Sequence, residues 1–158
     1  APHFTMKRMI DDYITRFYDP EDRRFRALAA GDYALAREIV AWKEKVAAAW
    51  DGIKVVSLNE ATVPSGSAGD KFDVTVTIDT NGLGRSLGVE LVCYRVEDGQ
   101  EHLFATVPFV AEKEDGNNLT FHLKYTLREA GVFRFGYRIY PVNANLPHRQ
   151  DFAYTRWI

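Results

Sequence analysis

The hydrophobic pattern changes its period near Gly52, and this change constrains the fold of the 158-residue chain more than any other feature. Before Gly52, apolar residues recur every three or four positions, which is typical of helices that bury one face. After Gly52, apolar and polar residues alternate, which is typical of β-strands with one face in a core. The sequence therefore predicts a mostly β protein with an N-terminal α segment, divided into a helical segment over residues 1–52 and a β-rich domain over residues 53–158.

Glycine, proline and aspartate signals divide the helical segment into about three helices. The first is expected at His3–Tyr18, where apolar residues line one face. Asp19 followed by Pro20 fits an N-cap with proline at the first helical position, which would open a second helix that Gly31 closes. Asp32 would then cap a third helix that ends at the change of period. The apolar face of the first helix comprises Phe4, Met6, Met9, Ile10, Tyr13, Ile14 and Phe17.

The alternating part predicts an immunoglobulin-like antiparallel β-sandwich of about seven strands. The dipeptides Asp98-Gly99 and Asp115-Gly116 are hairpin signals, because glycine accepts the positive φ that tight turns require. They predict that the third, fourth and fifth strands form one antiparallel meander, and Pro64–Gly69 is expected to be a turn-rich loop. The expected strands are Ile53–Leu58, Phe72–Ile78, Leu87–Val96, His102–Glu112, Leu119–Leu127, Val132–Tyr140 and Asp151–Trp157.

Charge and cysteine content narrow the classes of partner. Twenty Lys and Arg residues stand against 22 Asp and Glu residues, so no net positive charge attracts nucleic acid or an anionic membrane. Cys93 is the single cysteine, which excludes a disulfide framework within the chain and fits a reducing compartment. No apolar run approaches the roughly 20 residues that span a bilayer. We expect a soluble cytoplasmic protein without nucleic-acid or membrane partners.

No motif assigns a catalytic, cofactor-binding or metal-binding residue. The glycine-rich run Gly82–Gly88 leads into a predicted strand, whereas a dinucleotide loop needs a following helix N-terminus, so a strand connection is the favoured interpretation. His102, His122 and His148 lack the spacing that places two imidazoles on one helix face. Cys93 lies in an apolar strand, where a small buried thiol is the usual explanation.

Aromatic and polar residues near the C-terminus leave sugar binding open as a function. Pyranose rings stack on aromatic faces, and polar side chains bind their hydroxyl groups. The loop at residues 143–150 is polar and is flanked by aromatic residues. Core packing is the competing explanation, since alternating strands also need aromatic residues. The candidate glycan or interface contacts are Tyr140, His148, Arg149, Tyr154 and Trp157.

Two segments, His3–Tyr18 and Leu146–Trp157, resemble the C-terminal region of bacterial alpha-glucan phosphorylases, which act on glycogen, starch or maltodextrin. The first is similar to the helix with which the catalytic body of that family ends, and some bacterial members carry a β-rich extension after it. The family pattern is Thr-x-x-Arg-Met-x-x-x-Tyr-x-x-x-Phe/Tyr-Tyr-x-Pro, and it is met here by Thr5, Arg8, Met9, Tyr13, Phe17, Tyr18 and Pro20.

The resemblance implies a parent glycosyltransferase of carbohydrate metabolism that releases glucose 1-phosphate from α-1,4-glucans, with pyridoxal phosphate held on a lysine. That lysine lies upstream of this region in the family, so no catalytic or cofactor-binding residue is carried over. The expected function is a C-terminal accessory fragment, not itself an enzyme, that docks on or supports the catalytic body. The alternative is a carbohydrate-binding module that tethers α-glucan. A homo-oligomer formed through the first helix is a further expected assembly.

Overall fold

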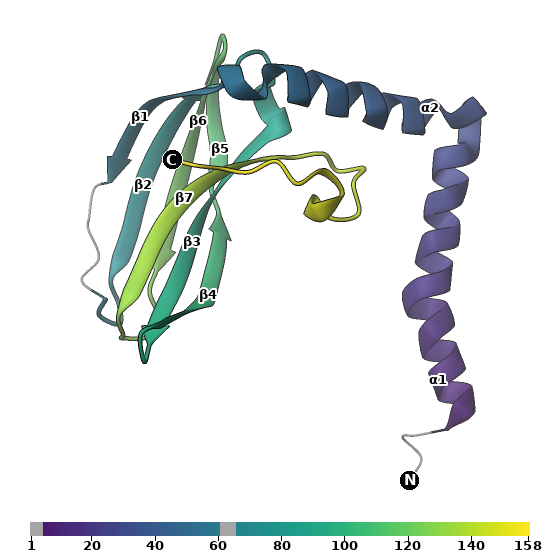
Figure 1. Ribbon diagram of the computed structural model, residues 1–158, viewed down its shortest axis with the longest axis horizontal. Coiled ribbons are helices and arrows are strands. Elements are labelled where there is room, and N and C mark those ends of the chain that lie inside the picture. The colour runs from purple at the N-terminus through teal and green to yellow at the C-terminus, as the bar shows by residue number, and fades with distance from the viewer. Residues whose placement is uncertain (1–4, 61–65) are drawn as a thin grey trace. The chain divides into compact units, whose positions relative to one another are not determined.

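A computed structural model describes residues 5–60 and 66–158, and it divides the chain into two compact units, Ala1–Lys43 and Glu44–Ile158 (Figure 1). The first unit is helical, and the second contains the end of a helix and all the strands described. The mostly β architecture with an N-terminal helical segment is therefore as predicted. Within the described ranges, no helix combines the length and the apolar character that a membrane crossing requires.

Helix α1 spans Met6–Tyr13 and begins with a side-chain cap. The Thr5 hydroxyl oxygen accepts a hydrogen bond from the Arg8 backbone N–H at 3.4 Å, which satisfies one of the free donors of the first turn. One turn later, the Arg8 guanidinium pairs with the Asp12 carboxylate at 3.8 Å. The predicted start of this helix at His3, and the apolar residue Phe4, lie outside the described residues.

The helix continues past Asp19 and Pro20, so the predicted N-cap at Asp19 is wrong. Asp19 has helical angles (φ −65°, ψ −42°), and its N–H donates to the Ile14 carbonyl five residues earlier. Residues Ile14–Tyr18 form a π-helical turn that leads into α2, Asp19–Ala49. Proline cannot donate the regular helical bond, and a wider turn before it reorganises the backbone where that bond is missing. The helix is thereby continued through a proline.

A break at Ala30–Tyr33 interrupts α2 and confirms the predicted end at Gly31. Gly31, Asp32 and Tyr33 all have φ between 54° and 61°, the left-handed region that ends a helix. The predicted cap at Asp32 is wrong, because an N-cap residue needs an extended φ. The Asp32 carboxylate instead pairs with the Arg37 guanidinium at 3.2 Å. The helix axis changes direction at this break (Figure 1).

The eight strands in the described residues form two antiparallel four-stranded sheets. In sheet A, the order is β1-β2-β6-β5; in sheet B, it is β4-β3-β7-β8. Strands β2 and β3 pair over nine residues with β6 and β7, respectively. The bounds are Lys54–Glu60 for β1, Lys71–Asp79 for β2, Leu87–Glu97 for β3, Gln100–Pro108 for β4, Val110–Asp115 for β5, Asn118–Thr126 for β6, Phe133–Pro141 for β7 and Arg156–Trp157 for β8.

The core lies on the apolar faces of the central strands, as the alternation predicts. Phe72 of β2 meets Phe135 of β7 edge to face with 4.7 Å between ring centroids, so side chains of the two sheets are in contact. Each fully buried Val, Leu, Ile or Phe contributes about 1.5–3 kcal/mol of transfer free energy. The most deeply buried apolar residues include Phe72, Val74, Val76, Ile78, Val89, Leu91, Leu119, Phe121, Leu123 and Ile139.

The predicted strand His102–Glu112 is wrong, because the chain changes sheets within it. Strand β4 ends at Pro108, which has no N–H to continue a ladder, and β5 begins at Val110 in the other sheet. Phe109 between them is buried, and its ring meets Tyr137 edge to face at 5.7 Å. The Asp98-Gly99 turn joins β3 to β4, with positive φ at both residues as a type I′ hairpin requires. The predicted three-strand meander is therefore split between two sheets.

The predicted C-terminal strand Asp151–Trp157 is largely irregular. A short 3₁₀ helix covers Arg149–Phe152, and only β8 pairs with β7. Aromatic packing explains the apolar spacing that imitates a strand, because the Tyr154 ring contacts Phe152 at 4.7 Å and Trp50 at 5.2 Å. Of the predicted loop Pro64–Gly69, the first two residues lie outside the described residues. The rest is a turn in which the backbone N–H groups of residues 66 and 67 donate to Asp70, each at 2.9 Å.

The end of α2 is capped by a side chain from the β-rich unit. The Asn81 amide nitrogen donates to the Ala49 carbonyl at 3.0 Å, which satisfies an acceptor of the last helical turn. A Cβ at residue 52 would overlap the Asn81 amide, so glycine is needed there for close approach. A 3₁₀ turn covers Trp50–Gly52, so the helix ends next to Gly52, as predicted. Gly52 contributes by leaving room for Asn81, which caps the last helical turn.

Candidate functional site

An exposed apolar face on α1 and the following π-helical turn is the first candidate surface, here called the helix face. Met9 is 49% exposed and Phe17 is 59% exposed. Tyr13 and Phe17 lie one turn apart with their ring centroids at 5.6 Å. The helix face comprises Met6, Met9, Ile10, Tyr13, Ile14 and Phe17. Exposed apolar patches of this kind are typical of interaction surfaces.

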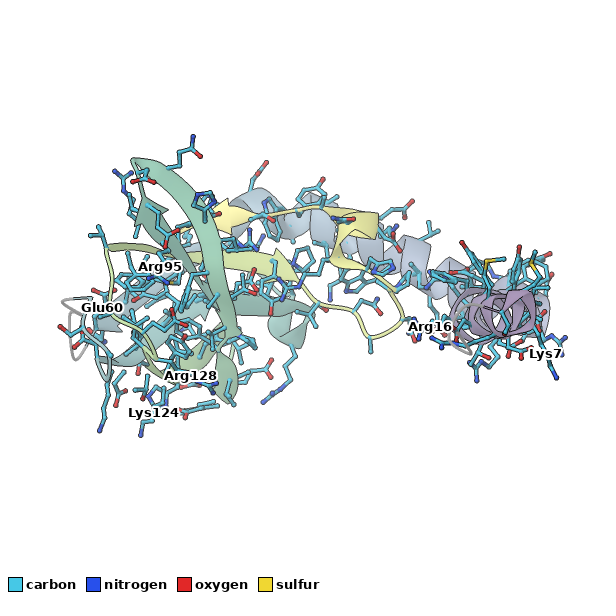
Figure 2. All side chains as sticks on the ribbon, turned by 90° about the horizontal axis from the view of Figure 1, so that it is seen from below. Lys7, Arg16, Glu60, Arg95, Lys124 and Arg128 are labelled. Carbon is cyan, nitrogen blue, oxygen red and sulfur yellow. The ribbon has the colours of Figure 1, made fainter. Side chains whose placement is uncertain are left out.

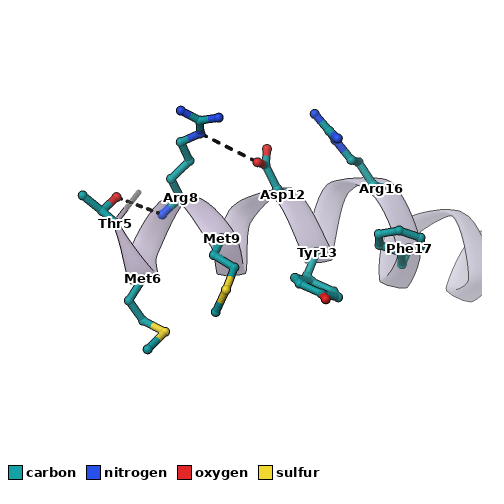
Figure 3. Close-up of a pocket in the computed structure, with 8 residues that line it drawn as sticks. All are labelled: Thr5, Met6, Arg8, Met9, Asp12, Tyr13, Arg16 and Phe17. Atoms are coloured by element: carbon teal, nitrogen blue, oxygen red, sulfur yellow. Dashed lines mark hydrogen bonds and ion pairs between the residues drawn. The ribbon is translucent and has the colours of Figure 1, made fainter. Parts of the chain in front are cut away.

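Charged residues separate the helix face from the rest of α1. Met6, Met9 and Tyr13 project from one side of the helix, whereas Arg8 and Asp12 point away from them (Figure 3). These side chains border a groove of about 540 Å³. The residues at its border are Thr5, Met6, Arg8, Met9, Asp12, Tyr13, Arg16 and Phe17. A partner on this groove would meet apolar side chains flanked by charges of both signs.

A buried carboxylate organises the second candidate surface, in the β-rich unit. Glu90 of β3 is only 1% exposed, and its two carboxylate oxygens accept from different arginines. Arg138 donates from Nε to Oε1 at 2.6 Å, and Arg149 donates from Nη1 to Oε2 at 2.6 Å. Arg138 lies directly opposite Glu90 on β7, and Arg149 comes from the C-terminal segment. These short charge-assisted bonds fasten that segment over the sheet.

Two glycines let aromatic rings lie flat against the same face. Opposite Tyr140 lies Gly88, where a Cβ would overlap the Tyr140 ring. A Cβ at Gly136 would press on the Trp157 ring at 3.0 Å. The Arg149 guanidinium stacks over the Tyr140 ring at 3.8 Å from its centroid, a close cation–π contact. Burial raises the pKa of the Tyr140 hydroxyl, so the ring remains neutral beside the ion pairs.

Three of the five candidate contacts from the sequence meet in one pocket of about 140 Å³. Tyr140, Arg149 and Tyr154 line it, whereas His148 and Trp157 are not among the lining residues. Trp157 is 53% exposed and covers Gly136 beside Arg138. The lining residues are Glu90, Arg138, Tyr140, Pro141, Arg149, Gln150, Phe152, Ala153, Tyr154 and Thr155.

Glu90, whose carboxylate pairs with both arginines of this pocket, was not among the site residues predicted from the sequence. A signal was present, since Glu90 is a carboxylate within the apolar run Leu87–Cys93. Residues 87–93 are all buried, so both faces of β3 are covered here. A charge in such a strand requires a partner, and Arg138 and Arg149 are the partners.

His122 bridges two carboxylates on sheet A. Its Nε2 lies 2.7 Å from an Asp73 oxygen, and its Nδ1 lies 3.0 Å from a Glu112 oxygen. The hydrogen bond to Asp73, followed by that to Glu112, raises the pKa of His122 above its ordinary 6.5. The hydrogen bond from His122 lowers the pKa of Asp73 below its ordinary 3.8. Across residues 5–60 and 66–158, no group of three or more His, Cys, Asp or Glu side chains could hold a metal ion.

Cys93 lies fully buried in β3, as the sequence predicts. Burial raises the pKa of its thiol to about 11, which keeps the thiol protonated and unreactive at neutral pH. Charged side chains lie on both units, among them Lys7 and Arg16 on the helical unit and Glu60 and Lys124 on the β-rich unit (Figure 2). This mixture accompanies the small net charge of −2.

A family model for the glycogen phosphorylase C-terminal domain matches residues 50–158, which include β1–β8 and the Glu90 cluster. The chain belongs to this family. The resemblance seen in the sequence is therefore confirmed. No solved structure matches the chain significantly.

Curated relatives of this phosphorylase C-terminal domain are much longer proteins. A maltodextrin phosphorylase from Thermococcus litoralis is 24% identical over 99% of the chain, which covers 19% of that protein. A glycogen phosphorylase from Mycobacterium bovis is 27% identical over 63% of the chain, which covers 12% of that protein. A glycogen phosphorylase from Mycobacterium tuberculosis shows the same identity and coverage. The chain thus spans at most about a fifth of the length of these relatives.

Pyridoxal phosphate is the cofactor that the resemblance implies for the parent, bound upstream of this region. A Schiff base with this cofactor needs a lysine in a pocket. Arginines line the groove on α1 and the pocket beside Glu90, and no lysine lines either of them. We therefore assign no step to the cofactor on this chain.

Glu90→Gln tests the buried ion-pair cluster. The introduced amide group would place a donor against an arginine and remove the charge that both guanidiniums share, so we expect a loss of about 2 kcal/mol in unfolding free energy. Urea denaturation measures this loss. The matched control is Glu101→Gln, which removes the partner of Arg134 at the exposed surface and should cost about 0.5 kcal/mol or less. Equal losses in the two variants would contradict the structural role of Glu90.

The His122 bridge predicts a pH-dependent stability. Because the folded pKa of His122 is raised, its contribution is complete below pH 6.5 and is lost as the pH rises through the folded pKa. The contribution of Asp73 is complete above pH 3.8 and is lost as the pH falls through its lowered pKa. The urea midpoint should be higher at about pH 5.5 than at about pH 8.5, and His122→Asn should reduce this difference.

The control for that experiment is His102→Asn, a substitution at an exposed histidine of β4. It should retain the pH dependence of the unmodified chain. An unchanged pH dependence in the His122 variant would show that other groups cause the effect.

Proposed function

We propose that the chain is a non-catalytic accessory module at the C-terminus of an alpha-glucan phosphorylase, and that it docks on the catalytic body through its helix face. Membership of the C-terminal domain family supports the parent assignment. The parent reaction would be phosphorolysis of α-1,4-glucan to glucose 1-phosphate in the cytoplasm, with pyridoxal phosphate bound upstream. The catalytic body is the proposed partner.

The exposed helix face is the observation that carries the docking proposal. The six apolar side chains of the helix face, which lie between Met6 and Phe17 on α1 and the π-helical turn, are all exposed, and none of the residues of α1 is buried. Water contact along such a face is unfavourable by roughly 25 cal/mol per Å² of apolar area. The alignment with the Thermococcus litoralis protein extends over 99% of the chain and therefore includes α1. If α1 belongs to the catalytic body in such relatives, that body would cover its apolar face.

The division at residues 1–52 and 53–158 has a functional meaning under this proposal. The first part would be the end of the catalytic body with its connecting helices, and the second an immunoglobulin-like β-sandwich. Two antiparallel sheets with contacts between inward rings, such as Phe72 and Phe135, support the sandwich. Asn81, which caps α2 at Ala49, supports a fixed connection between this sandwich and the last helical turns.

Docking is tested by Met9→Asp together with the control Lys7→Asp. Both variants place a carboxylate in α1, but only the first places it on the helix face. Burying an unpaired charge in an apolar interface costs more than about 1.4 kcal/mol, so Met9→Asp should weaken binding to the upstream phosphorylase body at least about tenfold. Lys7→Asp should leave binding within about threefold. Calorimetric titration of the chain into the body measures both.

Self-association supplies a second readout of the same surface. Without the catalytic body, the chain should form a homo-oligomer through its helix face, visible by light scattering and abolished by Met9→Asp. A chain that neither binds the body nor self-associates would contradict the docking proposal.

A carbohydrate-binding module is the second candidate, and the Trp157 ring is the observation that favours it. The ring is half exposed, is backed by Gly136 and has the Arg138 guanidinium 5.6 Å from its centroid. An exposed ring beside a cationic donor suits the apolar face and the hydroxyl groups of a pyranose. Tyr140 is less suited, because Arg149 already stacks on its ring.

Affinity electrophoresis in amylopectin gels tests this second candidate. A glucan-binding module should migrate more slowly in the polysaccharide gel, and Trp157→Ala should restore free migration. The control is Leu103→Ala, which truncates an exposed apolar side chain on β4 of the same sheet. Free migration of the unmodified chain would exclude the candidate, and circular dichroism would verify that the variants remain folded.

A further inference from the structure

We propose that the pocket beside Glu90 is a binding site for a small oxyanion, with phosphate, either free or carried by a sugar, as the ligand. The site is formed entirely by residues of the β-rich unit, mainly Arg138 and Arg149 with Gln150 and Thr155. The inference goes beyond the accessory role, because docking through the helix face neither requires nor supplies an anion site.

The charge of the cluster is the first argument. Arg138 and Arg149 each pair with Glu90, so two guanidinium cations share one carboxylate and leave one net positive charge at the pocket. The carboxylate is only 1% exposed, whereas the side chains of Arg138 and Arg149 are 28% and 52% exposed. An entering anion would therefore meet the guanidiniums before it meets the carboxylate.

The unused guanidinium nitrogens are the second argument. The ion pairs occupy Nε of Arg138 and Nη1 of Arg149. A guanidinium carries five N–H donors in a planar fork, so both arginines retain further donors for a second acceptor. Arginine forks suit tetrahedral oxyanions because two N–H groups can donate to two oxygens at once.

Preorganisation is the third argument. Glu90 holds one end of each guanidinium at 2.6 Å, and the Tyr140 ring holds the plane of Arg149 at 3.8 Å. Arginine side chains that are fixed before binding lose less conformational entropy when a ligand arrives. Glu90 thus acts as a positioning residue for the two donors.

The size of the pocket selects the ligand class. A volume of about 140 Å³ corresponds to about five water molecules at roughly 30 Å³ each. One tetrahedral oxyanion fits this space, but a drug-sized ligand site usually has about 300–1,000 Å³. Gln150, Tyr154 and Thr155 in the wall add neutral polar groups that can bind oxyanion oxygens. A sugar attached to the phosphate would lie outside this volume.

The competing explanation is that the cluster only fastens the C-terminal segment. Nuclear magnetic resonance of the intact chain distinguishes anion binding from a purely structural role. Phosphate is titrated into one sample and chloride into a second sample at the same ionic strength. We expect saturable shifts of the Gln150 and Thr155 amide signals, with a dissociation constant on the order of 1 mM. Absence of a saturable effect of phosphate would overturn the proposal, whatever the outcome of the docking experiments.

Variants and ligand analogues locate the site and identify the form of phosphate. Arg149→Gln should weaken phosphate binding at least about tenfold, whereas the control Arg134→Gln, the same charge change on β7, should not. Full affinity in Arg149→Gln would overturn the assignment to this pocket. If that variant fails to fold, the titration of the unmodified chain still decides whether phosphate binds near Gln150 and Thr155. Tighter binding of glucose 1-phosphate than of phosphate would identify a sugar phosphate, equal binding would identify free phosphate, and glucose should have no effect.

Discussion

The carboxylate of Glu90 lies in a buried run of β3, residues 87–93, that contains no other charged residue, and its pairing fixes the path of the last part of the chain. A buried unpaired carboxylate is strongly destabilising, so two cations must reach it. Arg138 is supplied by the neighbouring strand at the opposite position of the ladder. Arg149 can be supplied only if residues beyond β7 fold back over sheet B. The position of Tyr154 against Trp50 then links that segment to the turn that follows α2.

Three glycines in the β-rich unit allow a side chain to lie directly against the backbone. Gly88 and Gly136 leave room for the rings of Tyr140 and Trp157 on the outer face of sheet B. Gly52 leaves room for the Asn81 amide that closes α2. At each position a methyl group would displace the neighbour on which another contact depends. The rings beside Gly88 and Gly136 contact Arg149 and Arg138, respectively, so these two glycines also leave room for contacts of the arginines that pair with Glu90.

The sequence predicted features that depend on local pattern and missed those that depend on distant partners. Alternation identified the buried face Phe72–Ile78, and Gly31 identified the break in α2. The N-cap prediction at Asp19 was wrong because it used only the local pair Asp19-Pro20. The π-helical turn that accommodates Pro20 begins five residues before Asp19, in the continuing helix. Tyr140 and Arg149 were predicted as candidate contacts from their residue type, and both line the pocket beside Glu90. Glu90, 59 residues from Arg149 in sequence, could be identified as their partner only from the fold.

The two candidate surfaces need partners of different kinds. The helix face presents thioether, aliphatic and aromatic groups, whose affinity for a partner grows with the area removed from water and has little directional preference. A second apolar surface is the kind of partner that suits it. The Glu90 pocket presents fixed guanidinium donors in a small volume, so a ligand is selected there by charge and geometry. The two surfaces belong to different compact units of the chain.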